Sequence, residues 1–211
     1  MSRMPAAQRR AQLLDRAAEL FATHGYARTT TSQLAKAAGV TEPIIYRHFD
    51  SKRGLFIALI RRAGEQTLDM WTRHLEDAAD PADRLRRLIG DNPMVSPEGR
   101  DAYRVFLQAI SEVDSDDEVA EAVREHIDRV HGFLKNELEV AQQAGRVGKR
   151  FSAEVLAWLM INLGMGYGVI AAMGVKGHGK DSAGVHIQDV IARAMVGRPP
   201  DPQKQAPGKG A

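Results

Sequence analysis

Residues 29–55 of the chain read TTTSQLAKAAGVTEPIIYRHFDSKRGL. They predict two short helices joined by a tight turn, followed by the start of a third helix. Thr30 with Gln33 three positions later forms a capping box, so the first helix is expected to begin at about Thr31. Gly39 ends that helix, because glycine takes a left-handed conformation at little steric cost. This order is typical of a helix-turn-helix, whose second helix enters the major groove of DNA.

The second short helix is predicted from Thr41 to His48. Thr41 is a suitable N-cap, and Pro43 is tolerated in the first turn because an N–H there has no helical partner. Ile45 and Phe49 are four positions apart and continue a buried apolar stripe. A helix this short is unstable by itself in water, so packing against its neighbours has to hold it.

Composition favours helices throughout the 211 residues. Hydrophobic residues make up 44% of the chain, enough for a sizeable core, whereas aromatic residues make up only 6%. The apolar residues are mostly Ala, Leu, Val, Ile and Met, which favours an all-α fold over a β-sandwich. The chain has no cysteine, which excludes disulfides and fits a reducing cytoplasm. The first ten residues lack the apolar core of a signal peptide, so secretion is not expected.

Charge is distributed unevenly along the chain. Residues 1–55 contain nine Lys and Arg against four Asp and Glu, a balance of +5. The formal net charge of the whole chain is +2, so the remaining residues carry a balance of −3. A basic N-terminal quarter suggests a polyanionic partner for that part alone. Without the helix-turn-helix, a solvated surface of mixed charge would explain the same distribution.

Helical spacing and caps continue to the C-terminal end. Ser115 with Glu118 forms a second capping box, which is expected to start a helix that runs to about Ala144. Further helices are expected at residues 7–23, 51–79, from 81, around 103–110, at 152–174 and at 185–196. The predicted organisation is an N-terminal three-helix helix-turn-helix domain at 1–50, a larger helical domain at 51–197 and a disordered tail at 198–211.

Val155 to Val175 is an uncharged run of 21 residues, long enough to span a bilayer. Gly164 and Gly168 form a small-xxx-small pair, which suits a membrane helix dimer and equally suits close packing at a subunit interface. Glycines and Asn162 dilute the hydrophobicity of the run, and no second candidate span is present. A buried helix of a soluble protein is therefore favoured over a membrane span.

About the first 60 residues resemble the TetR family of bacterial transcriptional regulators. The resemblance rests on spacing and chemistry that agree together at Gly25-Tyr26, Thr29-Thr30, Leu34-Ala35, Ala38-Gly39-Val40, Ile45-Tyr46, Phe49, Ser51-Lys52 and Leu55. It implies a homodimeric repressor that binds a near-palindromic DNA operator and is released by a small, largely apolar effector. It also implies that residues 51–197 bind the effector and dimerise, with the Val155–Val175 helix and the last helix forming a four-helix seam.

Side chains on and around the second short helix are candidates for DNA contact. Base contacts are expected from Ser32, Glu42, Pro43, Ile44 and Arg47. Phosphate contacts are expected from Thr31, Tyr46, His48 and Lys52, with Thr41 at the helix start, and the resemblance supports Tyr46, His48 and Lys52 in that role. Glu42 can accept from a cytosine amino group or can serve only as a first-turn charge, and both remain open. His48 also fits an ordinary surface histidine.

No set of acids, bases or metal ligands has convincing spacing, so no enzyme activity, catalytic residue, metal site or cofactor is predicted. His126 and His131 are five positions apart, which puts them on different faces of a helix. The acidic stretch Glu112–Glu125 suits a capped, solvated helix start better than a cation site. Candidates for an apolar effector pocket with a few polar groups, most of which also fit a plain core, are Trp71, Tyr103, Phe106, Phe133, Trp158, Asn162 and Met165.

Two other interpretations remain open. The first is a regulator that works without a small effector, as an activator for example, and the second is a helical enzyme or binding protein. The +5 balance of residues 1–55 and the successive helix caps favour DNA binding. The predicted partners are double-stranded operator DNA, a second copy of the chain and a small-molecule effector, with no membrane and a cytoplasmic location.

Overall fold

The computed structural model describes residues 4–90 and 97–196, with the backbone alone for residues 97–103. Nine helices in this part of the chain form an all-α fold, so the predicted fold class is confirmed. An isolated bridge between Lys180 and His186 is the one β pairing in the same residues. The tail predicted at 198–211 lies outside the described residues.

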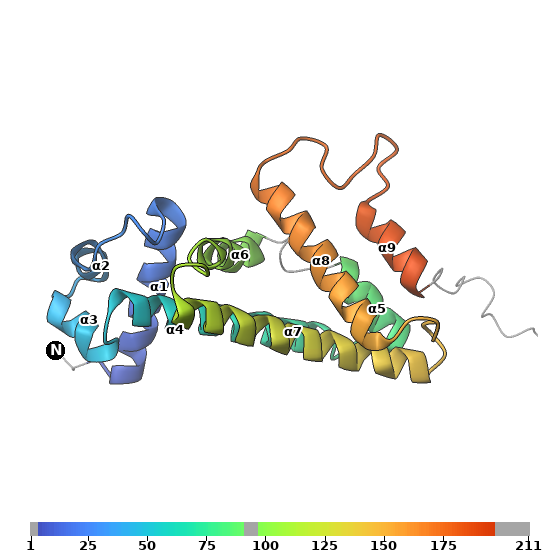
Figure 1. Cartoon of the computed structure of the whole chain (residues 1–211), viewed down its shortest axis with the longest axis horizontal. Coiled ribbons are helices and arrows are strands. Elements are labelled where there is room, and N and C mark those ends of the chain that lie inside the picture. The colour runs from blue at the N-terminus through green and yellow to red at the C-terminus, as the bar shows by residue number, and fades with distance from the viewer. Residues whose placement is uncertain (1–3, 91–96, 197–211) are drawn as a thin grey trace, which may run out of the picture.

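Three short helices lie together at one end of an elongated molecule: α1 (Ala6–His24), α2 (Thr31–Ala38) and α3 (Glu42–His48) (Figure 1). Two long helices, α4 (Lys52–His74) and α7 (Asp117–Gln143), run along the molecule and pack against each other. They connect the N-terminal helices to the rest of the chain.

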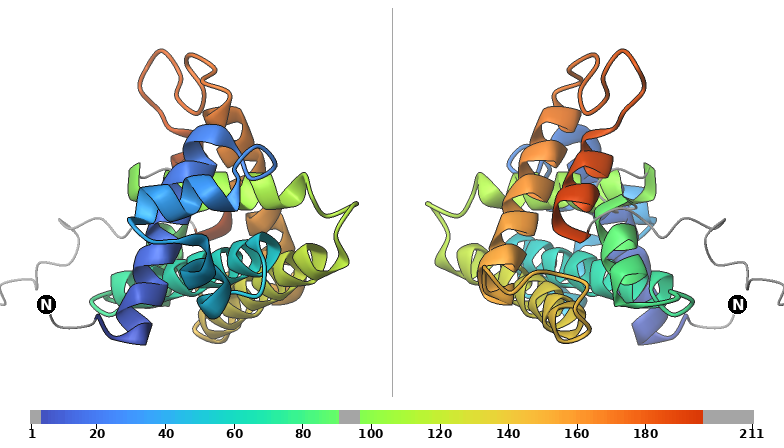
Figure 2. Two further views of the ribbon diagram at one scale, coloured as in Figure 1. Left: turned by 90° about the vertical axis from the view of Figure 1, so that its left-hand side faces the viewer. Right: turned by 90° about the vertical axis from the view of Figure 1, so that its right-hand side faces the viewer.

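The other end of the molecule is formed by α5 (Pro81–Gly90), α8 (Ala153–Ala172) and α9 (Ile187–Val196) (Figures 1 and 2). α8 packs on α7, and α9 packs on α5. Between the two ends lies α6 (Pro97–Ile110), which contacts α1, α4, α7 and α8. α6 is therefore in contact with both halves of the protein.

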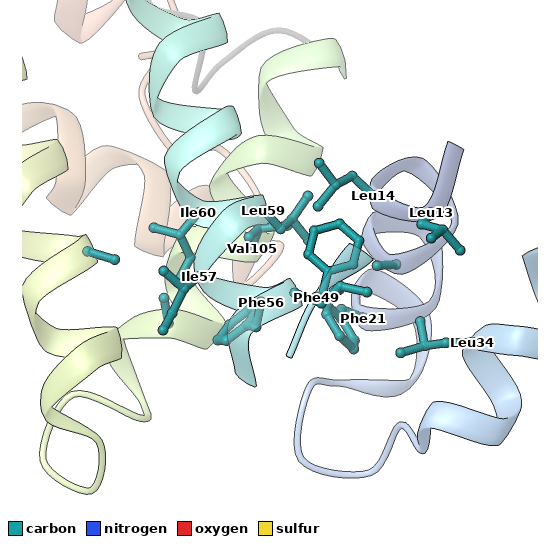
Figure 3. Close-up of a cluster of buried hydrophobic side chains, with 14 of the residues drawn as sticks. Leu13, Leu14, Phe21, Leu34, Phe49, Phe56, Ile57, Leu59, Ile60 and Val105 are labelled. Carbon is teal, nitrogen blue, oxygen red and sulfur yellow. The ribbon is translucent and has the colours of Figure 1, made fainter. Parts of the chain in front are cut away.

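A first hydrophobic core joins α1, α2 and α3 to the beginning of α4 and to α6 and α7 (Figure 3). Phe21 and Phe56 are fully buried, with their rings edge to face at 5.5 Å, and Tyr26 stacks on Phe56 at 4.1 Å. Leu55 of α4 is also fully buried in this core. The domain division predicted at residue 50 falls just before α4, whose first turns belong to the core of the N-terminal helices.

A second core lies between α4, α5, α7, α8 and α9 and includes the buried residues Trp71 and Leu138. A partly buried ion pair lies beside it, with Glu137 buried and Arg84 about one-third exposed. The Arg84 guanidinium donates to both carboxylate oxygens of Glu137, at 2.6 and 2.7 Å, and to the carbonyl of Leu75 at 2.8 Å. This one side chain ties α5 to α7 and to the end of α4.

Two predicted helix boundaries are wrong. α4 ends at His74 and not at Ala79, because Leu75 is fully buried and arginines of α5 occupy the terminal carbonyls. Arg87 donates to the His74 carbonyl at 3.0 Å, and Arg84 donates to that of Leu75.

α7 is capped by Asp116, whose carboxylate accepts from the N–H groups of Glu118 and Val119. The predicted capping box of Ser115 with Glu118 is therefore wrong, since the Ser115 hydroxyl donates backwards to the Glu112 carbonyl at 3.0 Å. The predicted start of α8 at residue 152 is confirmed, and Ser152 Oγ caps the helix by accepting from the Val155 N–H at 3.2 Å.

α8 has two apolar faces. Its inner face, with Ala157 and Ile161, is buried in the second core. Its outer face carries large apolar side chains that are exposed in the single chain: Val155, Trp158, Leu159, Leu163, Val169, Ile170 and Met173. Among the described residues, α8 is also the one helix that is long and apolar enough to cross a membrane. Only 17% of its most apolar segment is buried inside the protein. The predicted burial of this helix is confirmed for the inner face only.

Candidate functional site

α2 begins and ends as the sequence predicts. The Thr30 hydroxyl accepts from the Gln33 N–H at 3.2 Å, and the Gln33 side chain accepts from the Thr30 N–H at 2.8 Å, which confirms the capping box. Gly39 has a φ of +65°, in the left-handed region that favours glycine. The turn into α3 therefore depends on Gly39.

α3 begins after Thr41, but the Thr41 hydroxyl does not cap it, so this part of the prediction is wrong. The second helical residue is Pro43, which has no N–H to donate, and the Ile44 N–H donates to the Thr41 carbonyl at 3.0 Å. The seven-residue helix depends instead on packing, because Ile45 is fully buried and Phe49 nearly so.

The same packing turns the opposite face of α3 toward solvent. Thr31 Oγ1 and Tyr46 Oη lie 3.1 Å apart and join α2 to α3 through a hydrogen bond on this surface. The predicted DNA-contacting residues of the two helices are all exposed or partly exposed: Thr31, Ser32, Thr41, Glu42, Pro43, Ile44, Tyr46, Arg47 and His48. We call this set the α2–α3 surface.

Arginines of α1 lie beside the C-terminal end of α3. The Arg10 guanidinium carbon is 4.8 Å from the centroid of the Phe49 ring. Partial burial lowers the pKa of His48, and the charges of Arg47, Arg10 and Arg9 lower it further. Arg9 and Arg10 were not predicted as part of the site, because they precede the motif by about 20 residues and only the fold brings them next to it.

Lys52 is held at the junction of α4 with the segment between α1 and α2. Its ammonium donates to the carbonyls of Tyr26 and Thr29, both at 3.0 Å, and lies 4.4 Å from the centroid of the Tyr26 ring. These contacts fix the position of α4 against the N-terminal helices. They leave one N–H of the ammonium for a phosphate oxygen, so the DNA contact of Lys52 stays a prediction.

Two cavities lie in the C-terminal half and share a wall. The inner cavity, of about 50 Å³, is lined by Thr67, Trp71, Leu88, Phe106, His126, Ile127, Val130, Leu134, Met160, Ile161, Gly164 and Met165. The outer cavity, of about 270 Å³, lies between α5, α8 and α9, with Ile89, Ile170 and Ile191 in its lining. Leu88, Met160 and Gly164 line both cavities.

Four of the seven predicted effector residues line these cavities. Trp71, Phe106 and Met165 line the inner cavity and Asn162 lines the outer one. Phe133 lies behind Trp71, with the two rings stacked at 5.7 Å. Tyr103 lies outside the residues whose side chains are described.

Trp158 lines neither of these cavities. It lies on the outer face of α8 and stacks on His131 at 4.3 Å, so its prediction as a pocket residue is not supported. The glycine pair predicted for a subunit seam lies on the inner face, where Gly168 is buried in the chain and Gly164 lines both cavities. That interpretation of the pair is wrong, because the outer face is about half a turn away and carries Gly166 instead.

His126 of α7 was not predicted as a cavity residue. Its imidazole is edge-on to the Phe106 ring at 5.2 Å. Burial, and to a lesser extent the charge of Arg129, lower the pKa of His126 to about 4, so the ring is neutral at pH 7. Within the described part of the chain, Nδ1 of His126 and Nε1 of Trp71 are buried without a hydrogen-bond partner. A single histidine on a helix carries no pattern that reveals the cavity beside it.

Two family models match the chain, one over the helix-turn-helix and the other over helices α5 to α9. The model of bacterial regulatory proteins of the tetR family matches residues 13–59. The model of the C-terminal part of BetI-type transcriptional repressors matches residues 81–196, more than half of the chain. The chain belongs to the TetR family.

This TetR-family transcriptional regulator is 34% identical over 88 residues to the HTH-type transcriptional activator FasR of Mycolicibacterium smegmatis. The match covers 42% of this chain and 40% of FasR, so it spans about two-fifths of that relative's length.

Solved structures share the TetR-family fold over most of the chain. A transcriptional regulator from Saccharomonospora viridis in complex with choline has a TM-score of 0.75 at 23% identity, covering 89% of this chain and 93% of that one. The transcriptional regulator FadR from Bacillus subtilis in complex with stearoyl-CoA has a TM-score of 0.69 at 17% identity. That match covers 90% of this chain and 99% of FadR.

In this TetR-family regulator, α6 links the inner cavity to the DNA-binding helices. Phe106 lines the inner cavity. Gln108 donates to the Phe21 carbonyl at 2.7 Å and accepts from the Tyr26 N–H at 3.1 Å. Phe106 and Gln108 are two positions apart, which corresponds to a rotation of about 200° around the helix axis. Their side chains therefore leave α6 on opposite sides. One helix therefore touches the cavity on one side and the end of α1 on the other.

Proposed function

We propose that the protein is a homodimeric repressor that binds a near-palindromic operator and is released by a small, largely apolar effector. The α2–α3 surface carries the DNA-binding part of this proposal, because it is solvent-facing, rests on the buried Ile45 and lies beside Arg47, Arg10 and Arg9. The match of residues 81–196 to BetI-type repressors supports repression.

The α2–α3 surface contains groups for both kinds of DNA contact. Glu42, Pro43 and Ile44 are at the N-terminal end of α3, which points into the major groove in a docked helix-turn-helix. Ser32 of α2 and Arg47 in the last turn of α3 are also assigned to base edges. Phosphate contacts, which set register, are assigned to Thr31, Thr41, Tyr46, His48 and Lys52.

The outer face of α8 supports the homodimer. Val155 is 56% exposed and Met173 73% exposed, and a contiguous apolar surface of this kind marks an interaction site. Val190 of α9 adds to it, at 56% exposed. A second copy that covers this face would turn α8 into a helix buried all round, which its uncharged sequence suits. For that reason we infer a dimer in the cytoplasm and not a membrane span.

The dimer is tested by placing a charge on the outer face. Leu159→Lys is expected to give a monomer by light scattering without detergent, because an ammonium in an apolar seam is costly to bury. Ile110→Lys, at an exposed aliphatic position of α6, is the matched control and should leave the mass unchanged. A Leu159→Lys protein that keeps the dimer mass would contradict the seam.

The cavities support a small, largely apolar effector. The inner cavity lies between α4, which carries Lys52 at its start, and α6, which carries Gln108. An effector that binds one arrangement of these helices more tightly shifts the population toward it and moves the two α2–α3 surfaces of the dimer out of register with the operator.

DNA binding is tested with duplexes from the promoter region beside the protein's own gene, against a scrambled duplex of the same length. Arg47→Ala is expected to weaken binding to the promoter duplex roughly tenfold or more, in a fluorescence anisotropy titration. Lys149→Ala removes a positive charge from an exposed position outside the α2–α3 surface and is the control. Equal affinity of the unaltered dimer for both duplexes would refute sequence-specific binding.

Activation is the second candidate, since FasR is an activator. Transcription in vitro from the bound promoter separates the two outcomes. Repression is expected, and a rise in transcript with added protein would assign the activator role.

A further inference from the structure

Two side chains that line the inner cavity carry buried polar atoms without a hydrogen-bond partner. In the described residues, Nε1 of Trp71 and Nδ1 of His126 have no hydrogen-bond partner, although the two side chains are only 6% and 7% exposed. Both residues line the inner cavity. A buried polar group without a partner costs free energy, so a bound molecule that supplies a partner is favoured.

The chemistry of that partner follows from the two groups. The indole N–H of Trp71 only donates, so the bound molecule has to present an acceptor to it. A neutral imidazole can donate or accept through Nδ1, depending on its tautomer. No charged side chain lines the inner cavity among the described residues, so nothing there compensates a charged head group. A neutral carbonyl oxygen meets these conditions.

The sizes of the cavities indicate the rest of the molecule. The inner cavity, of about 50 Å³, has room for only a few water-sized groups. Gly164, which has no side chain, lies in the wall that the two cavities share, beside Leu88 and Met160. The outer cavity, of about 270 Å³, has a largely aliphatic lining that includes Ile170 and Ile191.

We propose that the effector is an elongated neutral amphiphile, with a carbonyl-type head in the inner cavity bonded to Trp71 Nε1 and an alkyl chain that passes Gly164 into the outer cavity. This proposal rests on the proposed function, since it specifies the class of effector. Trp71 and His126 select the head, and the aliphatic side chains of α5, α8 and α9 select the chain length.

The test uses the full-length dimer with ¹⁵N-labelled tryptophan. The chain has two tryptophans, so it gives two indole N–H signals, and Trp158→Phe assigns them. The probes are 2-decanone, 2-butanone and decyltrimethylammonium. 2-Decanone is expected to move the Trp71 N–H signal downfield and to leave the Trp158 signal in place. A Trp71 signal that does not move at saturating ketone would overturn the proposal.

Affinities test the division between head and chain. 2-Decanone has six more CH₂ groups than 2-butanone, and each buried CH₂ group contributes roughly fourfold. Burial of half of them in the outer cavity therefore makes 2-decanone bind at least about sixtyfold more tightly than 2-butanone. Trp71→Phe keeps an aromatic ring and removes the indole N–H. It should weaken the binding of 2-decanone roughly two- to tenfold. Trp158→Phe is the matched control and should leave the affinity unchanged.

Two further results bear on the proposal. Ile191→Phe places a larger side chain of α9 in the outer cavity. It should weaken the binding of 2-decanone and leave the binding of 2-butanone unchanged. Equal affinity of the two ketones, or tighter binding of decyltrimethylammonium than of 2-decanone, would overturn the proposal.

Operator affinity separates this inference from the proposed function. If 2-decanone moves the Trp71 signal but leaves operator affinity unchanged, control by this effector fails and the binding site stands. If the ketones do not bind and a different molecule releases the operator, the effector class is wrong and the proposed function stands.

Discussion

Gly64 allows α4 to approach α7 closely. An ideal Cβ built at this position would lie 2.6 Å from Nδ1 of His126 and 3.2 Å from Nη2 of Arg129. His126 is buried and packs against the Phe106 ring, so it has little room to move away. Gly64→Ala is therefore a test of whether this contact is as tight as the geometry indicates.

Two effects of opposite sign decide the outcome of Gly64→Ala. Alanine is favoured over glycine inside a helix by roughly 0.5–1 kcal/mol. Inserting a methyl group into a packed contact costs about 1–3 kcal/mol. The overlap with a buried ring makes the second effect the larger one, so we expect a net loss of about 1–2 kcal/mol in the free energy of unfolding.

Gly132→Ala is the matched control, because an added Cβ at this exposed position of α7 meets nothing within 4 Å. It should stabilise the protein by roughly 0.5–1 kcal/mol in urea unfolding at fixed protein concentration. In a His126→Ala background the obstacle is gone, and Gly64→Ala should become stabilising as well. The reasoning is refuted if Gly64→Ala stabilises the otherwise unaltered protein as much as Gly132→Ala does.

Three further predictions concern charged groups. His126 has its ordinary pKa of 6.5 in the unfolded chain and a pKa of about 4 in the folded protein. The free energy of unfolding therefore falls by about 3 kcal/mol as the pH drops from 6.5 to 4. His126→Leu should remove that part of the pH dependence of urea unfolding. Lys52→Ala should weaken binding to all duplexes and reduce the slope of log affinity against log salt concentration by about one. A changed base preference would contradict a phosphate contact. Arg84→Ala leaves Glu137 buried without its partner and should cost about 3 kcal/mol in thermal unfolding, against less than about 0.5 kcal/mol for the exposed Arg124→Ala.

Local sequence predicted the parts of the structure that local interactions determine. The capping box of Thr30 and Gln33, the left-handed Gly39 and the start of α8 at Ser152 involve residues within a few positions of one another, and all are confirmed. The cap assigned to Thr41 failed for an equally local reason, because Pro43 has no N–H and the Ile44 N–H donates to the Thr41 carbonyl instead of the hydroxyl.

Boundaries and sites that depend on distant residues were not predictable in this way. The residues after His74 continue a sequence that suits a helix, and α4 stops there because Arg84 and Arg87 of α5 take the terminal carbonyls. The inner cavity is a similar case, since Trp71 and His126 are 55 positions apart and neither has a pattern around it.

The position of Gly64 along α4 has a consequence for control of DNA binding. Lys52 and Trp71 lie on opposite sides of Gly64, about 18 Å and about 10 Å away along a helix of 1.5 Å rise per residue. Since a helix of this length is stiff, we propose that an effector bound in the inner cavity pushes the Trp71 end and turns α4 about its close contact with His126. The Lys52 end then moves the opposite way by nearly twice the distance and carries the carbonyls of Tyr26 and Thr29 with it. A small displacement in the inner cavity is thereby enlarged at the base of the α2–α3 surface.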